Sequence, residues 1–164
     1  MKILLFLLLA TTMWGQKTSQ GVVSRVIDCD TYVVLVNSFR GSPQLITVRL
    51  VNVDCPELAS IPKRKPAQEY GQSAADSVRN LIEGENVDLT YYGLDYFGRV
   101  IAFIRIGGVR LDDILLSRGW AWYYKDYHGH KAYKNGQKLM EEAKTKKIGL
   151  WAYPNPIKPS IYRK

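Results

Sequence analysis

The sequence predicts a small α+β domain made mainly of β-strands. Five stretches with the composition of strands fall in the first two-thirds of the chain. Helical patterns lie among and after them, and no strand–helix unit repeats in alternation. About 145 residues remain after an N-terminal leader, which is enough for one domain with one hydrophobic core. A small mixed β-barrel or α+β domain is therefore expected.

The first three strands share a β-branched and aromatic composition. They are expected at residues 22–27, 32–36 and 45–53. An Asp-rich turn at 28–31 separates the first two, and a turn cluster at 37–43 separates the second from the third. Pro56 then ends regular pairing, because the residue before a proline favours an extended backbone.

The remaining elements mix helices and strands. Apolar residues at helical spacing predict a helix from Tyr70 to Ile82, which Gly84 ends. Later elements are expected as strands at 87–92 and 99–106, a short helix near 111–115 that stops at Gly119, and a helix from about Lys131 to Lys147. The tail after Trp151 is expected to be extended and docked on the domain.

The N-terminus has the pattern of a secretory signal peptide. Lys2 precedes an apolar run at 3–10, and residues 1–15 fit the usual lengths of the charged and apolar regions. A membrane anchor is the alternative, although a span needs about 20 apolar residues. We expect a protein secreted to the medium or the periplasm, with no membrane attachment once the signal is removed.

The charge of the chain favours a polyanionic partner. Its 23 basic and 15 acidic residues give a net charge of +8. Such a balance supports salt-sensitive binding to nucleic acid. The same charge also serves solubility, so it does not identify the partner by itself.

The two cysteines, Cys29 and Cys55, each lie beside an aspartate. In an oxidising compartment an isolated pair predicts one disulfide, which would stabilise the fold by about 3.5 kcal/mol on the chain-entropy account. Two buried thiols are the alternative. A zinc site is disfavoured because the pair has no histidine neighbours.

Three short segments carry groups suited to phosphodiester hydrolysis. They are residues 27–31, 49–57 and 95–99, which together contain several carboxylates and two arginines. That reaction needs a metal, a base and positive charge where the transition state becomes negative. Taken singly, each residue has a duller explanation as a turn former or as half of a surface salt bridge. Together they predict a hydrolase.

The same segments resemble the thermonuclease family, the staphylococcal-nuclease-like (SNase-like) domains. The resemblance rests on Ile-Asp-Cys-Asp-Thr at 27–31, Arg49 with Val-Asp-Cys-Pro-Glu at 53–57, and Asp-Tyr-Phe-Gly-Arg at 95–99. Supporting matches are Gly-Trp-Ala at 119–121 and Gly-Leu-Trp at 149–151. The resemblance covers about residues 20–159 and implies a five-stranded oligonucleotide-binding (OB) barrel with three α-helices.

The resemblance also implies a function and a site. The function is Ca²⁺-dependent cleavage of DNA, RNA or both by a monomer, with products that end in 3′-phosphates. The implied calcium ligands are Asp30, Asp54 and the backbone carbonyl of Cys55, and the implied catalytic residues are Arg49, Glu57 and Arg99. Glu57 suits a general base because a carboxylate at neutral pH can accept a proton. Arginine forks suit phosphate oxygens.

Aromatic and basic side chains near the expected site are candidates for nucleotide contact. They are Tyr96, Phe97, Tyr124, Lys125 and Tyr127. A mixture of aromatic and basic side chains is suited to base stacking, although ordinary packing also explains the cluster. Tyr96 and Phe97 stand where the family often carries lysine and tyrosine, so this contact departs from the family pattern.

Three further alternatives stay open. The triplet at 63–65 contacts phosphates or belongs to a solvated loop. The run at 128–130, His-Gly-His, is expected to be a flexible loop rather than a metal site. A non-catalytic nucleic-acid-binding OB module is the rival function, since fold alone does not determine activity. The presence of both aspartates and all three catalytic residues favours the enzyme.

Overall fold

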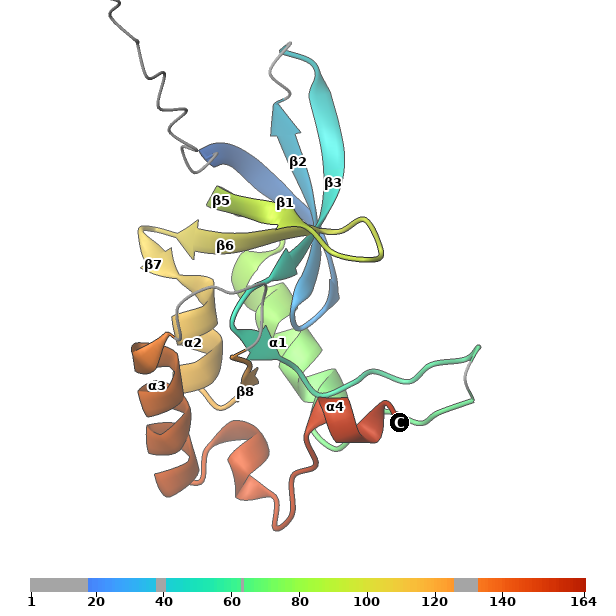
Figure 1. Ribbon diagram of the computed structural model, residues 1–164, viewed down its shortest axis with the longest axis vertical. Coiled ribbons are helices and arrows are strands. Elements are labelled where there is room, and N and C mark those ends of the chain that lie inside the picture. The colour runs from blue at the N-terminus through green and yellow to red at the C-terminus, as the bar shows by residue number, and fades with distance from the viewer. Residues whose placement is uncertain (1–17, 38–40, 63, 126–132) are drawn as a thin grey trace, which may run out of the picture.

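Five strands close into a barrel, seen in the upper half of Figure 1. The computed structural model describes residues 18–37, 41–62, 64–125 and 133–164. The barrel strands are β1 (Thr18–Asp28), β2 (Thr31–Asn37), β3 (Pro43–Leu50), β5 (Asn86–Leu94) and β6 (Val100–Ile106). Their order is β3-β2-β1-β5-β6, and a parallel pairing of β3 with β6 closes the ring. The mainly-β OB-fold prediction is confirmed.

The register of the barrel gathers three distant segments at one rim. Arg49 of β3 lies opposite Thr31 on one side and opposite Ile101 on the other. Thr31 begins β2, and Arg99 directly precedes β6. The pairing therefore places the Asp30 turn, Arg49 and Arg99 together, although up to 69 positions of chain separate them.

Helices pack below the barrel (Figure 1). They are α1 (Gly71–Ile82), α2 (Leu111–Ser117), α3 (Lys134–Thr145), the 3₁₀ turn η1 (Gly149–Ala152) and the one-turn α4 (Pro159–Tyr162). On α1 the buried residues Ala74, Val78 and Ile82 recur every four positions, as expected of a helix with one apolar face. The helix prediction at 70–82 is confirmed, and Gly84 follows its end.

The prediction of one strand over residues 45–53 is wrong at its end. β3 stops at Leu50, and a turn leads to the short strand β4 (Val53–Asp54), which pairs with β8 (Trp122–Tyr123). Asn52 adopts a left-handed conformation with φ 62°, which asparagine tolerates better than most residues. Its side chain donates to Asp112, and its carbonyl accepts from the Tyr124 N–H. The turn carries Asp54 back toward Arg49.

Two glycines of the supporting motifs lie against each other. A Cβ on Gly119 would stand 2.3 Å from the Ile148 carbonyl oxygen, and one on Gly149 would stand 2.2 Å from the Gly119 oxygen. Both have positive φ, 64° and 61°. Only glycine permits this backbone contact, which joins the end of α2 to η1.

The C-terminal region differs in detail from its prediction. The tail is docked, but it is not extended throughout, since it contains η1 and α4; Pro159 begins α4, a position that proline favours. β7 (Val109–Arg110) adds a short strand beside β6. Residues 1–15 and 128–130 lie outside the described residues. Within the described ranges no helix combines the length and the apolar character needed to cross a membrane.

Candidate active site

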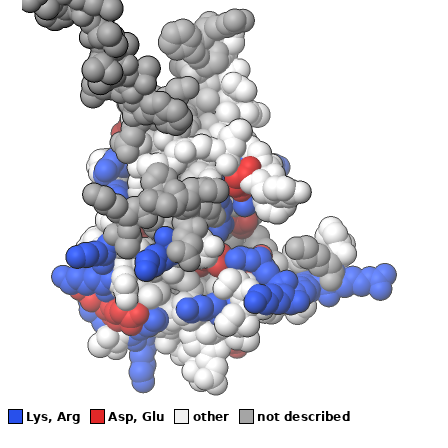
Figure 2. Space-filling view, in the orientation of Figure 1, with Lys and Arg blue, Asp and Glu red and all other residues white. Residues whose placement is uncertain are grey.

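A cleft of about 470 Å³ opens at the rim where the three motif segments meet. Its charged lining residues are Asp28, Asp30, Arg49, Asp54, Glu57, Arg99 and Arg163. Basic side chains dominate the lower half of the face shown in Figure 2, over α3, α4 and the loop before α1. The cleft thus combines acids with arginines on a molecule of net positive charge.

A second hollow of about 320 Å³ lies between the loop before α1 and the C-terminal tail. Proline, tryptophan and tyrosine dominate its lining, and Glu69 is the one charged lining residue in the part of the chain that is described. Acid–base or phosphate chemistry therefore belongs to the first cleft.

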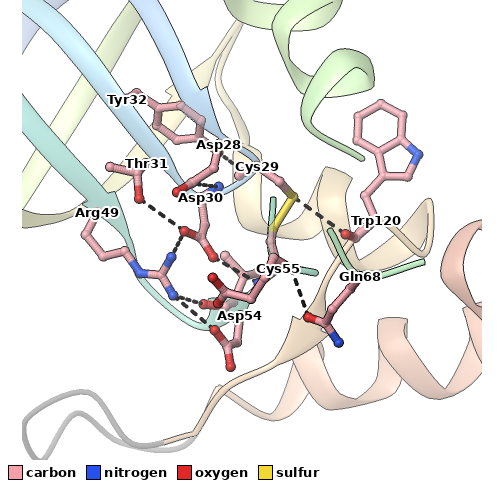
Figure 3. Close-up of a disulfide and its surroundings, with 12 residues drawn as sticks. Asp28, Cys29, Asp30, Thr31, Tyr32, Arg49, Asp54, Cys55, Gln68 and Trp120 are labelled. Carbon is pink, nitrogen blue, oxygen red and sulfur yellow. Dashed lines mark hydrogen bonds and ion pairs between the residues drawn. A yellow bond between two sulfur atoms is a disulfide. The ribbon is translucent and has the colours of Figure 1, made fainter. Parts of the chain in front are cut away.

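Arg49 lies between the two aspartates of the predicted metal site (Figure 3). It pairs with Asp30, and its Nη2 donates to Asp54 Oδ1 at 3.3 Å and to the Val53 carbonyl at 3.3 Å. All three residues are nearly buried: Asp30 is 2% exposed, Asp54 3% and Arg49 8%. Because little water reaches these charges, their mutual pairing matters more than a surface pair would.

The Cys29–Cys55 disulfide is confirmed, and it joins the two aspartate-bearing turns (Figure 3). The Cα atoms of the two cysteines are 5.8 Å apart. Next to the bridge, the Cys55 N–H donates to Asp30 Oδ2 at 2.9 Å. Asp30 is therefore held to β4 by a covalent link and by a hydrogen bond.

Arg99 is aimed by the hairpin that joins β5 to β6. Its Nε donates to Asp95 Oδ2 at 2.7 Å, its backbone N–H donates to Asp95 Oδ1 at 2.9 Å, and its Nη1 donates to Thr31 Oγ1 at 3.3 Å. Partial burial favours the neutral form of Asp95, but the hydrogen bonds and charge of Arg99 outweigh it and hold the pKa of Asp95 below its ordinary value. The carboxylate thus fixes the guanidinium beside the cleft.

Glu57 is positioned by Gln68, a residue that belongs to none of the three motif segments. The Glu57 N–H donates to Gln68 Oε1 at 2.9 Å, and the Gln68 N–H returns a bond to the Glu57 carbonyl at 2.9 Å. Gln68 is nearly buried and also donates from Nε2 to the Ile157 carbonyl at 2.9 Å. It therefore links the loop of Glu57 to the C-terminal tail.

Arg163 enters the cleft from the end of α4. Its guanidinium donates to both oxygens of Asp54, at 2.9 and 3.0 Å, and to Glu57 Oε1 at 2.6 Å. Partial burial disfavours the charged form, yet the two carboxylates raise the pKa of Arg163 above its ordinary value. The sequence carried no signal for this contact, because more than 100 residues separate Arg163 from both partners.

Asp28 is a further cleft residue that sequence reasoning passed over as a turn former. Its Oδ1 accepts from the Asp30 N–H at 3.0 Å. Burial raises its pKa, against the opposing charge of Arg49 and a hydrogen bond from Thr31. Its place two residues before Asp30 in an acidic turn was the available signal.

Two of the five predicted nucleotide-contact residues line the cleft. Phe97 and Tyr124 line the cleft, and Phe97 is 78% exposed with the Arg99 guanidinium carbon 5.5 Å from its ring centre. Tyr96 and Lys125 are exposed and do not line it in the described structure, while Tyr127 lies outside the described residues.

One residue of the basic triplet at 63–65, Lys65, contacts the C-terminal segment. Lys65 donates to the carbonyls of Tyr162, at 3.0 Å, and Arg163, at 3.3 Å. Its ammonium group therefore anchors the chain end in this conformation.

The donor set suits a hard cation. Asp30 and Asp54 present buried carboxylates beside one cleft, and Asp54 already holds a positive group, the guanidinium of Arg163. Oxygen ligands of this kind fit Ca²⁺, which takes several oxygens in flexible geometry. Among the described residues no three His, Cys, Asp or Glu side chains stand as a ready-made metal cluster. The carboxylates are paired with arginines instead.

An OB barrel with acids and arginines gathered in one rim cleft carries the groups that a phosphodiester-cleaving protein, a nuclease, needs. The family model described as "Staphylococcal nuclease homologue" (SNase) matches residues 47–153. The chain belongs to this family, and nuclease activity on nucleic acid is its general function.

Relatives support the assignment. The chain is 31% identical over 144 residues to an "Uncharacterized endonuclease" of Escherichia coli, which covers 87% of this chain and 84% of that protein. It is 32% identical over 142 residues to an "Uncharacterized endonuclease" of Haemophilus influenzae, covering 87% and 71%. It is 31% identical over 140 residues to "Staphylococcal-like nuclease CAN1" of Arabidopsis thaliana, covering 85% of this chain and 38% of the relative.

Proposed function

We propose that the protein is a secreted, calcium-dependent nuclease that hydrolyses phosphodiester bonds of DNA, RNA or both. The observation that carries the proposal is the single cleft lined by Asp30, Asp54, Glu57, Arg49 and Arg99. The leader-like residues 1–15 and the disulfide support export to an oxidising compartment.

Asp30 and Asp54 would hold the calcium ion, with the backbone carbonyl of Cys55 as a third oxygen. When bound, such an ion withdraws negative charge from a phosphate group. The disulfide keeps the two carboxylates at a set separation, so that the donors are arranged before the substrate arrives.

Glu57 is the proposed general base. Its side chain is about one-third exposed and reaches the cleft, so water has access to it. It takes a proton from the water whose oxygen attacks phosphorus, and the bond from phosphorus to the 5′ oxygen breaks. The leaving oxygen takes up a proton from solvent, and the product ends in a 3′-phosphate.

Arg49 and Arg99 are the proposed phosphate clamps. They enter the cleft from β3 and from the turn before β6, and each has its orientation set by carboxylates. Planar guanidinium forks match the oxygens of a phosphate that gains charge in the transition state.

The test uses the purified protein on single-stranded DNA, duplex DNA and RNA, with calcium or with chelator. We expect cleavage with calcium only, and Glu57→Gln to lower kcat by about a thousandfold because the base is lost. The matched control is Glu85→Gln, an exposed glutamate between α1 and β5 outside the cleft, which should keep full activity. Full activity in chelator would exclude the metal.

The rival function is a binding module that does not cleave. It predicts that the wild-type protein retains each substrate intact while Arg49→Ala weakens binding. Appearance of 3′-phosphate ends with the wild type, and their loss in Glu57→Gln, would exclude this rival.

A further inference from the structure

We propose that the C-terminal segment, residues 157–164, is a plug that closes the cleft to cations, with Arg163 as the group that a divalent cation must displace. The proposal rests on the proposed function, because the displacing ion is the one assigned to Asp30 and Asp54. It adds a built-in competition between the chain end and the metal.

Arg163 engages the two kinds of group that the reaction needs. It bonds both oxygens of Asp54, the proposed ligand, and an oxygen of Glu57, the proposed base. With all three contacts made, Asp54 is committed to two guanidiniums, those of Arg163 and Arg49. Both oxygens of Asp54 accept from Arg163, so a cation bound to Asp54 would stand against that guanidinium, and we expect Arg163 to leave.

The charges of the cleft support a cation in place of the plug. Its lining contains four carboxyl groups, those of Asp28, Asp30, Asp54 and Glu57. Without Arg163 only two guanidiniums, Arg49 and Arg99, oppose them among the lining residues. Carboxyl groups then outnumber guanidiniums in the cleft, and a bound cation would offset that difference.

The segment is held by a few polar contacts. Lys65 donates to the carbonyls of Tyr162 and Arg163, the Tyr162 hydroxyl donates to the Pro66 carbonyl at 2.7 Å, and Gln68 donates to the Ile157 carbonyl. The Lys65 and Tyr162 anchors lie outside the carboxylate cluster and can be altered without touching it, whereas Gln68 also positions Glu57.

Release of the segment should cost little. α4 is one turn long, Pro159 is its one buried residue, and the Arg163 side chain is 41% exposed. Segments with little buried apolar surface open locally at low free energy. A ligand that binds the open form alone then shifts the population toward it.

Calcium titration by calorimetry, without nucleic acid, tests the plug. If the plug is closed in about 90% of the metal-free protein, its removal tightens the apparent dissociation constant about tenfold. We expect Arg163→Ala to bind calcium about tenfold more tightly than the wild type. The matched control is Lys164→Ala, which removes the exposed charge that follows Arg163 in the same segment and should bind like the wild type.

Hydrogen exchange gives a readout independent of affinity. In the wild type, saturating calcium should speed amide exchange in residues 157–164 at least several-fold, because the bound form is the open form. Lys65→Met, which removes an anchor but no cleft charge, should speed the same amides without calcium and tighten calcium binding in part.

The outcomes separate the plug from the nuclease. Equal calcium affinity in the wild type and Arg163→Ala, or exchange that slows on calcium binding, would overturn the plug while the nuclease stands. Weaker binding of substrate by Arg163→Ala at saturating calcium, with no change in calcium affinity, would make Arg163 a phosphate contact instead. If no variant binds calcium, the proposed metal dependence fails and the plug fails with it.

Discussion

Two Arg–Asp groups in this molecule share their chemistry and differ in what surrounds them. Asp112 is fully buried, and Arg110 meets both of its oxygens, with Nε at 3.0 Å and Nη2 at 2.5 Å. The guanidinium lies between the rings of Phe103 and Tyr133, with its carbon 3.9 Å from each centre. Burial opposes the charged form, but Asp112 raises the pKa of Arg110 above its ordinary value. This pair is enclosed and matched.

The rim cluster is open on one side. Arg49 and Arg163 share Asp54, and Asp30 is held by Arg49 and by the Cys55 N–H, yet all of them border a cleft. Its carboxylates outnumber the arginines that belong to the barrel. A matched, enclosed pair serves the fold, whereas a surplus of charge beside a cleft is available to a ligand. In this molecule the surroundings of an ion pair, more than its residue types, separate structural ion pairs from functional ones.

Removal of one acid from each group should give the largest difference between the Arg110–Asp112 pair and the rim cluster. Asp112→Ala should lower the free energy of unfolding by about 3–5 kcal/mol, because the largely buried Arg110 loses its carboxylate and Asn52 loses its acceptor. Asp54→Asn should lower it by less than about 1.5 kcal/mol, since it relieves surplus negative charge. Denaturant unfolding measures both. Replacement of the pair, as Arg110→Met with Asp112→Leu, should restore part of the loss, because Asn52 still lacks its acceptor. An equal loss in both single variants would contradict the distinction.

The disulfide is a second feature that separates the rim cluster from the Arg110–Asp112 pair. Cys29→Ser with Cys55→Ser should lower the free energy of unfolding by about 3.5 kcal/mol, the loop-closure contribution on the chain-entropy account. A reductant should lower the melting temperature of the wild type and leave the double variant unchanged. Unfolded, unreduced wild type should contain no titratable thiol, and two thiols there would rule out the bridge in solution.

Replacement of Arg99 at the rim should lower activity and leave stability almost unchanged. Arg99→Lys should reduce kcat/KM about a hundredfold, equivalent to about 2.7 kcal/mol, because an ammonium group cannot keep the planar fork toward a phosphate. The melting temperature should stay within a few degrees. Arg105→Lys, on an exposed position of β6, is the matched control and should keep full activity. Equal loss in both variants would point to a general charge effect.

The smallest expected effect concerns pH and the Asp95 turn. A lowered pKa means that ionised Asp95 stabilises the fold above the ordinary aspartate pKa of about 3.9, and that this contribution is lost as pH falls through the lowered value. Asp95→Asn should therefore cost about 1 kcal/mol between pH 5 and 8. The gap from wild type should shrink below about pH 4. A stability gap that widens on acidification would contradict a lowered pKa of Asp95.

Local signals predicted the elements well and the turns less well. The strands near 22–36 and the helix ended by Gly84 follow from β-branched runs and from apolar spacing. The break at Asn52 was missed, because its left-handed turn depends on the side chain of Asp112, 60 residues away. Pattern reasoning records local preference, and this turn is set by a distant partner.

Most strand and helix segments, the motif residues from Asp30 to Arg99 and the cysteine pair could be predicted from the sequence. Chemical type and local spacing carry that information without reference to the rest of the chain. The tertiary structure alone decided which groups meet, including Gln68 behind Glu57 and Arg163 across the cleft. The physical reason is that strand register and docking of the chain end set contacts between residues far apart in sequence, and no local preference encodes those contacts.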